Sequence, residues 1–245
     1  MLTKKIVLLA VLVAPGAAYA ASTAHLDHAD VDISNTASLQ RGARNYVSYC
    51  LGCHSAKYVR WNRVAADLGI DEKDLEQHLL PAGAKAFDTM QSAMPAAQAT
   101  AWFGVAPPDL SLIARSRGVD YLYTFLRTFY ADPARPTGVN NLVLPNTAMP
   151  HVLAPVQGVK VARIELVTRD GKTEEHIAGL AEGTPGELSE AEYDEFVRDT
   201  VNFLDYMGEP IKAKRQSMGV WVVLFLLVFW FMTYLLKKEY WKDIR

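Results

Sequence analysis

The chain has 245 residues, of which half are hydrophobic, and a formal net charge of −2. The charge is distributed unevenly along the chain. Residues 21–211 carry 16 Lys and Arg against 25 Asp and Glu, a net charge of −9, whereas the rest of the chain is basic. An acidic globular part argues against nucleic acid as a partner and favours a basic one.

Residues 1–20 have the pattern of a secretory signal. Lys4 and Lys5 precede an apolar run that is too short to span a bilayer comfortably, and Ala18-Tyr19-Ala20 matches the small-x-small rule for cleavage. We therefore expect export and a mature chain that begins at Ala21, with an uncleaved anchor as the alternative.

A pair of cysteines follows the first predicted helix. Apolar residues recur at helical spacing from Ser38, the predicted N-cap, up to Cys50-Leu51-Gly52-Cys53-His54. Two thiols at this spacing, followed directly by histidine, are typical of covalent attachment of a c-type haem, with the histidine as an iron ligand. The alternatives are a disulfide between Cys50 and Cys53, and a structural zinc site, which is weaker because the chain has no other cysteine.

The middle of the chain mixes loops and helices. Residues 81–109 are rich in Ala, Pro and Gly, and we expect loops that cover a buried group. They include Met90 and Met94, both possible iron ligands. Residues 106–118 are predicted as a helix that starts at proline and ends at Gly118. Residues 120–130 are predicted as a further helix, whose apolar stripe belongs to the core.

Met149 follows a loop of residues 131–146 that is dense in Pro, Gly and Asn. A thioether on an irregular loop suits an axial ligand of haem iron, and the neighbouring Pro150 stiffens its approach. Because buried methionine usually serves only as packing, Met94 and, more remotely, His151 stay as alternatives for the sixth ligand.

The last part of the globular region contains a hairpin and a helix. Residues 159–177 alternate around a tight-turn sequence and predict a β-hairpin, to which we assign no chemistry. Residues 189–207 predict a helix with a capping box of Ser189 and Glu192. The face opposite its apolar stripe carries Glu190, Asp194, Glu195 and Asp199.

Residues 218–236 contain no charged side chain. As a helix they would extend about 28 Å, close to the thickness of the bilayer hydrocarbon. Trp221, Tyr240 and Trp241 lie where interfacial anchors are expected. We predict a transmembrane helix, and since the signal exports the preceding domain, residues 237–245 are expected in the cytoplasm.

The order of these motifs resembles cytochrome c1, the haem subunit of the cytochrome bc1 complex, over nearly the whole chain after residue 20. The haem motif is common to all c-type cytochromes, but other matching segments are more specific. They are Arg41-Gly42, Pro107-Pro108-Asp109-Leu110-Ser111, Ala148-Met149-Pro150 and Asp199-Thr200-Val201-Asn202-Phe203-Leu204. Residues 140–145 lack the aromatic and glycine-rich pattern of many members.

The resemblance implies a mostly α fold: a cytochrome-c-like haem domain in residues 21–211 with loop insertions and a small β-hairpin, plus one C-terminal transmembrane helix. It implies one covalently attached haem c, with His54 and Met149 as iron ligands. It also implies an arginine on a haem propionate, for which Arg117 matches best and Arg115 is the alternative.

The implied function is electron transport in a bacterial respiratory chain. The periplasmic haem domain would take one electron at a time from the Rieske iron–sulfur protein and pass it to a soluble c-type cytochrome, with cytochrome b as the membrane partner. Acidic residues at 71–76 or 187–199 are candidates for docking a basic carrier. The alternatives are a free-standing membrane-anchored monohaem carrier that feeds a terminal oxidase or reductase, and a gas-binding or peroxidase-like haem protein with an open sixth position.

Overall fold

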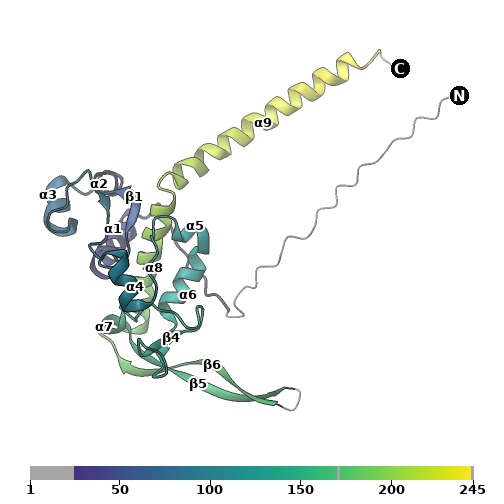
Figure 1. Ribbon diagram of the computed structural model, residues 1–245. Coiled ribbons are helices and arrows are strands. Elements are labelled where there is room, and N and C mark those ends of the chain that lie inside the picture. Colours follow the sequence, from purple (N-terminus) through teal and green to yellow (C-terminus); the bar gives the residue numbers. More distant parts are fainter. Residues whose placement is uncertain (1–24, 170–171, 244–245) are drawn as a thin grey trace.

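The computed structural model describes residues 25–169 and 172–243. The predicted signal at residues 1–20 lies outside the described residues. Figure 1 shows a helical domain from which a β-hairpin projects at one end and one long helix at the other. The mostly α fold with a small hairpin and a C-terminal helix is therefore confirmed.

The helices are α1 (Thr36–Asn45), α2 (Trp61–Leu68), α3 (Glu72–Asp74), α4 (Ala96–Phe103), α5 (Ile113–Arg117), α6 (Val119–Arg127), α7 (Ala154–Gln157), α8 (Glu190–Gly208) and α9 (Lys212–Tyr240), with π-helical turns η1 (Tyr46–Cys50) and η2 (Leu75–Leu79). The strands are β1 (Ala56–Arg60), β2 (Thr89–Met90), β3 (Phe129–Ala131), β4 (Val139–Asn141), β5 (Gly158–Arg169) and β6 (Lys172–Pro185). Strands β1 and β2 form an antiparallel pair, and the other four form a sheet in the order β4-β3-β5-β6. Within this sheet β3 and β5 run parallel, and the other neighbours are antiparallel.

Helix α8 is the centre of the domain, with α1, α5 and α6 packed around it (Figure 1). Its predicted capping box is present, since Ser189 accepts from the Glu192 backbone N–H and the Glu192 carboxylate accepts from that of Ser189. The apolar stripe predicted from the sequence is buried, and it includes Val197 and Val201, which have no exposed surface. Burial of such side chains is worth about 1.5–3 kcal/mol each and drives the packing of α8.

Helix α1 crosses α8 at Gly42. A Cβ atom at this position would collide with the carbonyl oxygen of Asp199 and with the Cβ of Phe203. Glycine therefore allows the two backbones to approach closely enough to bring the end of α1, and the cysteine motif after it, against α8.

Two predictions about this contact were wrong. The N-cap of α1 is Asn35, whose side chain accepts from the backbone N–H of Ser38 at 3.1 Å, and Ser38 itself is buried and donates to Asp199 at 2.6 Å. Asp199, predicted on the exposed face of α8, is only 4% exposed and also accepts from the Arg41 guanidinium at 2.9 Å. A charged residue is buried here because α1 supplies its partners.

The segment from 106 to 118 also differs from its prediction, because a helix forms only over Ile113–Arg117. Pro107 and Pro108 lack backbone N–H groups, and the segment is fixed instead by Asp109, whose carboxylate accepts from the backbone N–H groups of Lys57 and Ser111, both at 2.9 Å. Nearby, α4 lies within residues predicted as loops, and β3 and β4 take residues predicted as the end of a helix and as a loop.

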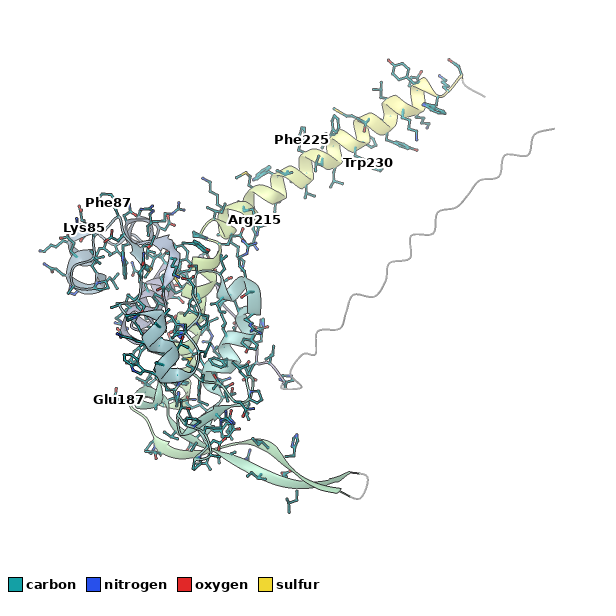
Figure 2. All side chains as sticks on the ribbon, viewed as in Figure 1. Lys85, Phe87, Glu187, Arg215, Phe225 and Trp230 are labelled. Carbon is teal, nitrogen blue, oxygen red and sulfur yellow. The ribbon has the colours of Figure 1, made fainter. Side chains whose placement is uncertain are left out.

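Helix α9 is the one helix in the described ranges that is long and apolar enough to cross a membrane, and no part of its apolar window is buried in the domain. Figure 2 shows Phe225 and Trp230 on this helix, away from the rest of the molecule. The helix is longer than the predicted 218–236, because the basic residues on both sides continue it.

Candidate haem site

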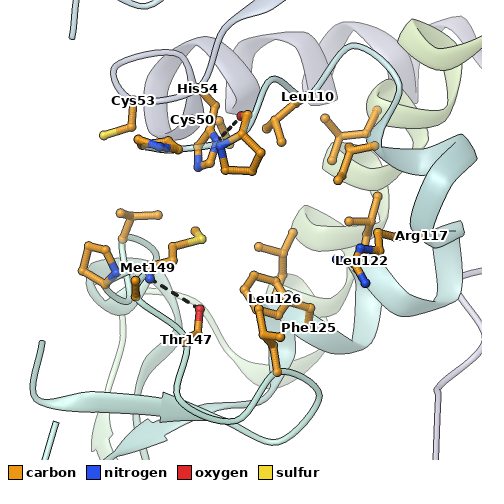
Figure 3. A pocket seen from close by; sticks show the side chains of 18 of the residues that line it. Cys50, Cys53, His54, Leu110, Arg117, Leu122, Phe125, Leu126, Thr147 and Met149 are labelled. Atoms are coloured by element: carbon orange, nitrogen blue, oxygen red, sulfur yellow. Dashed lines mark hydrogen bonds between the residues drawn. The ribbon is translucent and has the colours of Figure 1, made fainter. Parts of the chain in front are cut away.

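One apolar cavity lies between the cysteine motif, residues 103–110, the α5–α6 pair, the loop 144–152 and one face of α8. The residues that line it come from distant parts of the sequence, from Tyr49 to Leu204. Figure 3 shows Cys50, Cys53 and His54 along one wall and Met149 on the wall opposite. The fold thus brings together five of the six predicted site residues, these four and Arg117.

Cys50 and Cys53 both line the cavity as free thiols and form no disulfide with each other. They belong to a tight turn in which the backbone N–H groups of Cys53 and His54 donate to the carbonyl oxygen of Cys50 at 3.0 and 2.8 Å. The pKa of the Cys50 thiol is raised to about 12, mainly because the thiol is buried and to a smaller extent because Cys53 lies next to it. The arrangement therefore presents two free thiols to the cavity rather than a disulfide.

His54 is held by a hydrogen bond at one ring nitrogen. Its Nδ1 lies 2.8 Å from the carbonyl oxygen of Pro108, and because a carbonyl only accepts, Nδ1 carries the proton and Nε2 is left with a free lone pair. Burial lowers the pKa of His54, against the opposing effects of Pro108 and Asp109, so the ring is neutral near pH 7. A neutral imidazole fixed at Nδ1 is the form that binds a metal through Nε2.

The alternatives to Met149 lie elsewhere. Met94 does not line the cavity, and its backbone N–H donates to the Ser92 hydroxyl at 3.0 Å. His151 is stacked on Phe129 with ring centroids 4.9 Å apart, and it also does not line the cavity. Met90 is buried and does not line the cavity either, so that of these possible ligands only Met149 faces His54 across it (Figure 3).

The two arginines differ in the same way. Arg117 lines the cavity, and its guanidinium lies 5.5 Å from the ring centroid of Tyr121. Arg115 does not line it; its side chain packs near Gly208 and its Nη1 lies 3.9 Å from the Glu209 carboxylate. The structure therefore favours Arg117 over Arg115 as a residue that can contact a group in the cavity.

Sequence reasoning missed the partner of His54. The Pro108 group that orients the imidazole is a backbone carbonyl, which leaves no side-chain signal in the sequence. The proline pair next to Asp109 could have indicated it, because two adjacent prolines in a helix-poor segment leave their carbonyls free to accept.

The residues present fit a haem. A thiol pair, a neutral imidazole with a free nitrogen and a thioether sulfur on the opposite wall are the groups that attach and ligate haem c, and the apolar walls suit a porphyrin. Within residues 25–169 and 172–243, no cluster of three His, Cys, Asp or Glu side chains could hold a bare metal ion. A helical domain with this cavity, joined to a candidate membrane helix, has the features of a membrane-anchored c-type cytochrome.

The sequence model of the Cytochrome C1 family matches residues 30–244, so the chain belongs to the cytochrome c1 family. It is 49% identical over 220 residues to "Cytochrome c1" of Allochromatium vinosum, covering 90% of each chain. It is 46% identical over 241 residues to "Ammonia monooxygenase gamma subunit" of Nitrosomonas europaea, covering 98% of each chain. The solved structure "Hyperthermophilic respiratory Complex III" matches with a TM-score of 0.42 and 19% identity, over 91% of this chain and 89% of the other, and is too distant to carry an argument.

The names of the two relatives differ, and the family assignment rests on the family model and the first relative. Membership of this family implies haem c binding and a role as an electron-transfer subunit of a cytochrome bc1 complex. Together with α9, it supports a single-pass membrane protein.

Proposed function

We propose that this chain carries single electrons from the Rieske iron–sulfur protein to a soluble c-type cytochrome, as the haem subunit of a quinol–cytochrome c reductase. The observation that supports this most directly is the placement of Met149 opposite His54 in one apolar cavity that Cys50 and Cys53 also line (Figure 3). Haem c, when bound, supplies a reversible one-electron couple.

The protein's part is to attach and ligate one haem. Cys50 and Cys53 would form the two thioethers, and His54, through Nε2, and Met149, through its sulfur, would bind the iron. A Met/His ligand pair favours the reduced state relative to two histidines, and apolar walls that exclude water act in the same direction. With His54 and Met149 as ligands, the chain would leave no open position on the iron of the kind that a peroxidase-like protein needs.

Arg117 is the residue we assign to a haem propionate. A guanidinium forms strong paired hydrogen bonds with a carboxylate, and that of Arg117 borders the cavity. Arg115 is directed toward Glu209 instead.

The acidic domain would steer a basic carrier by long-range attraction that salt weakens. On α8 much of the predicted acidic face is neutralised within the domain, since Asp194 accepts from Arg127 at 2.6 Å and Asp199 from Arg41. The four carboxylates of residues 71–76 are all exposed, on the N-cap of α3, on α3 itself and on η2. We therefore favour the 71–76 cluster over the 187–199 face as the docking site.

The membrane arrangement follows from the same proposal. Residues 1–20 would direct export, which leaves the haem domain in the periplasm of a bacterial inner membrane and residues 237–245 in the cytoplasm. Apolar side chains are exposed all round α9, which suits lipid on some faces and cytochrome b on another.

The test is a difference spectrum of the material that co-purifies with the tagged full chain in mild detergent, reduced with dithionite minus oxidised. Bands of b-type haem beside the c-type band, with reduction by quinol, are the expected result. A c-type band alone would favour the free-standing carrier, and material without haem would overturn the proposal at its first step.

A further inference from the structure

The loop that carries Met149 is folded by the side chain of a buried asparagine. Asn141 has no exposed surface, and its Oδ1 accepts from the backbone N–H groups of Val143 at 2.9 Å and Leu144 at 3.1 Å. Its Nδ2 donates to the carbonyl oxygen of Phe125 in α6 at 2.7 Å. One amide group thus shapes the turn after β4 and ties it to the helix that borders the cavity.

Hydrogen bonds then lead from this turn to the methionine. The backbone N–H of Thr147 donates to the carbonyl of Leu144 at 3.2 Å, and the hydroxyl of Thr147 accepts from the N–H of Met149 at 3.4 Å. Asn140 supports the same loop, because its Oδ1 accepts from the backbone N–H of Asn146 at 2.7 Å. Asn146 has a φ of 65°, a left-handed conformation that asparagine tolerates better than most residues.

Both ends of the loop are fixed to the same residue of β3. Asn141 pairs with Phe129 in the ladder between β3 and β4. The ring of Phe129 is stacked on the ring of His151, with the ring centroids 4.9 Å apart and an angle of 4° between the ring planes. His151 lies two residues after Met149, and its Nε2 is 3.2 Å from the carbonyl oxygen of Gly158. Met149 is therefore held between two attachments to one strand.

We propose that Asn141 is a positioning residue for the sixth iron ligand. It makes no contact with the haem cavity and acts through the backbone of residues 143–149, which it holds so that Met149 faces His54. Asparagine suits this position because its side-chain oxygen accepts hydrogen bonds from two backbone N–H groups while its NH2 group donates to a backbone carbonyl oxygen. The inference rests on the proposed function, in which Met149 ligates the iron.

The test compares the full-length haem-loaded protein with its Asn141→Leu variant. Leucine keeps the number and branching of the side-chain heavy atoms and removes every hydrogen bond of the Asn141 side chain, including one that Oδ1 accepts from the Thr128 hydroxyl at 3.5 Å. Three readouts report on ligation: the long-wavelength absorption band of a methionine–ferric iron bond, carbon monoxide binding by the ferrous protein, and the reduction potential. Loss of these hydrogen bonds should raise the fraction of ferrous protein that binds carbon monoxide roughly tenfold or more, weaken the band and lower the potential. Asn141→Asp keeps the acceptor for Val143 and Leu144 but loses the amide donor to the Phe125 carbonyl, so it should show a band of intermediate strength.

Asn202→Leu is the matched control. Asn202 is also buried, at 1% exposure, and its Nδ2 donates to Asp32 and Ser38, away from the haem cavity. This variant should lose stability but keep the band and exclude carbon monoxide. If Asn141→Leu fails to retain haem, Asn141→Ser, which can still accept one hydrogen bond, should show a partial loss of the band.

An intact band and no carbon monoxide binding in the Asn141 variants would overturn the inference, as would an equal loss of the band in Asn202→Leu. The Met149→Leu variant separates this failure from that of the proposed function. If Met149→Leu opens the iron and the Asn141 variants do not, only the positioning role is wrong. If Met149→Leu changes nothing, the ligand assignment itself fails.

Discussion

The Nδ1 atom of His54 lies 2.8 Å from the carbonyl oxygen of Pro108, and this bond connects two motifs that are 54 residues apart in the sequence. It leaves Nε2 of this cavity-lining residue with a free lone pair, and it gives the proline pair a physical role as the support of the imidazole. In the proposed function, where His54 binds the haem iron, the hydrogen bond would also make the imidazole more electron-rich, as partners of metal-bound histidine generally do.

The support of Pro108 depends on Asp109, and Asp109→Ala should therefore disturb His54. The variant loses the two backbone hydrogen bonds from Lys57 and Ser111, which should cost about 1–3 kcal/mol of unfolding free energy and broaden the redox titration. Urea unfolding of the full chain in detergent, followed by haem absorbance, measures the first effect. An unchanged midpoint in both experiments would contradict this role.

The effect of Asp109→Ala on stability should depend on pH. Burial raises the pKa of Asp109, but the hydrogen bonds from Ser111 and Lys57 outweigh it, so the pKa lies below its ordinary value. A carboxylate whose pKa is lowered by folding contributes stability that is present above the unfolded pKa, about 4, and is lost as the pH falls through the folded pKa. The stability difference between wild type and Asp109→Ala should therefore be full at pH 7 and shrink below about pH 4.

Removal of the Arg117 charge should lower the reduction potential. A positive charge next to the haem favours the ferrous state, so Arg117→Gln should shift the midpoint downward by on the order of 50 mV, an energy of about 1 kcal/mol. Arg115→Gln is the control, since Arg115 does not border the cavity, and its midpoint should stay within experimental error of wild type. A larger shift for Arg115→Gln than for Arg117→Gln would reverse the assignment.

The sequence predicts those parts of the fold that local signals determine. The cysteine motif, the hairpin, the capping box of Ser189 and Glu192 and the C-terminal helix are all readable within a few residues, and the structure contains each of them. Asp199 shows where this fails: helical periodicity places it on the outer face, but its partner Arg41 is 158 residues away and draws it into the core.

In the candidate site, too, only part of the arrangement can be predicted from the sequence. The motif and the resemblance predict His54 and Met149 as iron ligands, whereas neither of them indicates the groups that orient these two side chains. Pro108 acts through a carbonyl, and Asn141 acts through amide contacts with three backbone groups that only the folded chain brings together.

Loss of the Asp199 carboxylate should destabilise the contact between α1 and α8. Asp199→Ala removes the partner of Ser38 and of Arg41, and because Arg41 stays partly exposed to water, we expect a loss of about 2–3 kcal/mol, below the range for a fully buried pair. Glu195 also lies near Arg41, at 3.3 Å, but is exposed, so Glu195→Gln should cost less than about 1 kcal/mol. Equal effects of the two variants in urea unfolding would argue against a special role of Asp199.

A methyl group at Gly42 should force α1 away from α8. Gly42→Ala places a Cβ against the Asp199 carbonyl and the Phe203 side chain, so we expect a loss of about 3 kcal/mol or more, or failure to retain haem. Gly219→Ala in α9 is the matched control, because nothing lies within 4 Å of its Cβ, and it should be neutral. Normal haem content and stability in Gly42→Ala would show that the two helices can separate without cost.

The ligation of the iron by Met149 is the central claim, and carbon monoxide binding to the ferrous Met149→Leu and Met94→Leu variants tests it most directly. Wild type and Met94→Leu should exclude carbon monoxide and keep their reduction potential, because Met94 lies outside the cavity. Met149→Leu should bind carbon monoxide rapidly, and its reduction potential should be lower than that of wild type. Carbon monoxide binding by Met94→Leu, with Met149→Leu unchanged from wild type, would contradict the claim and move the sixth ligand to Met94.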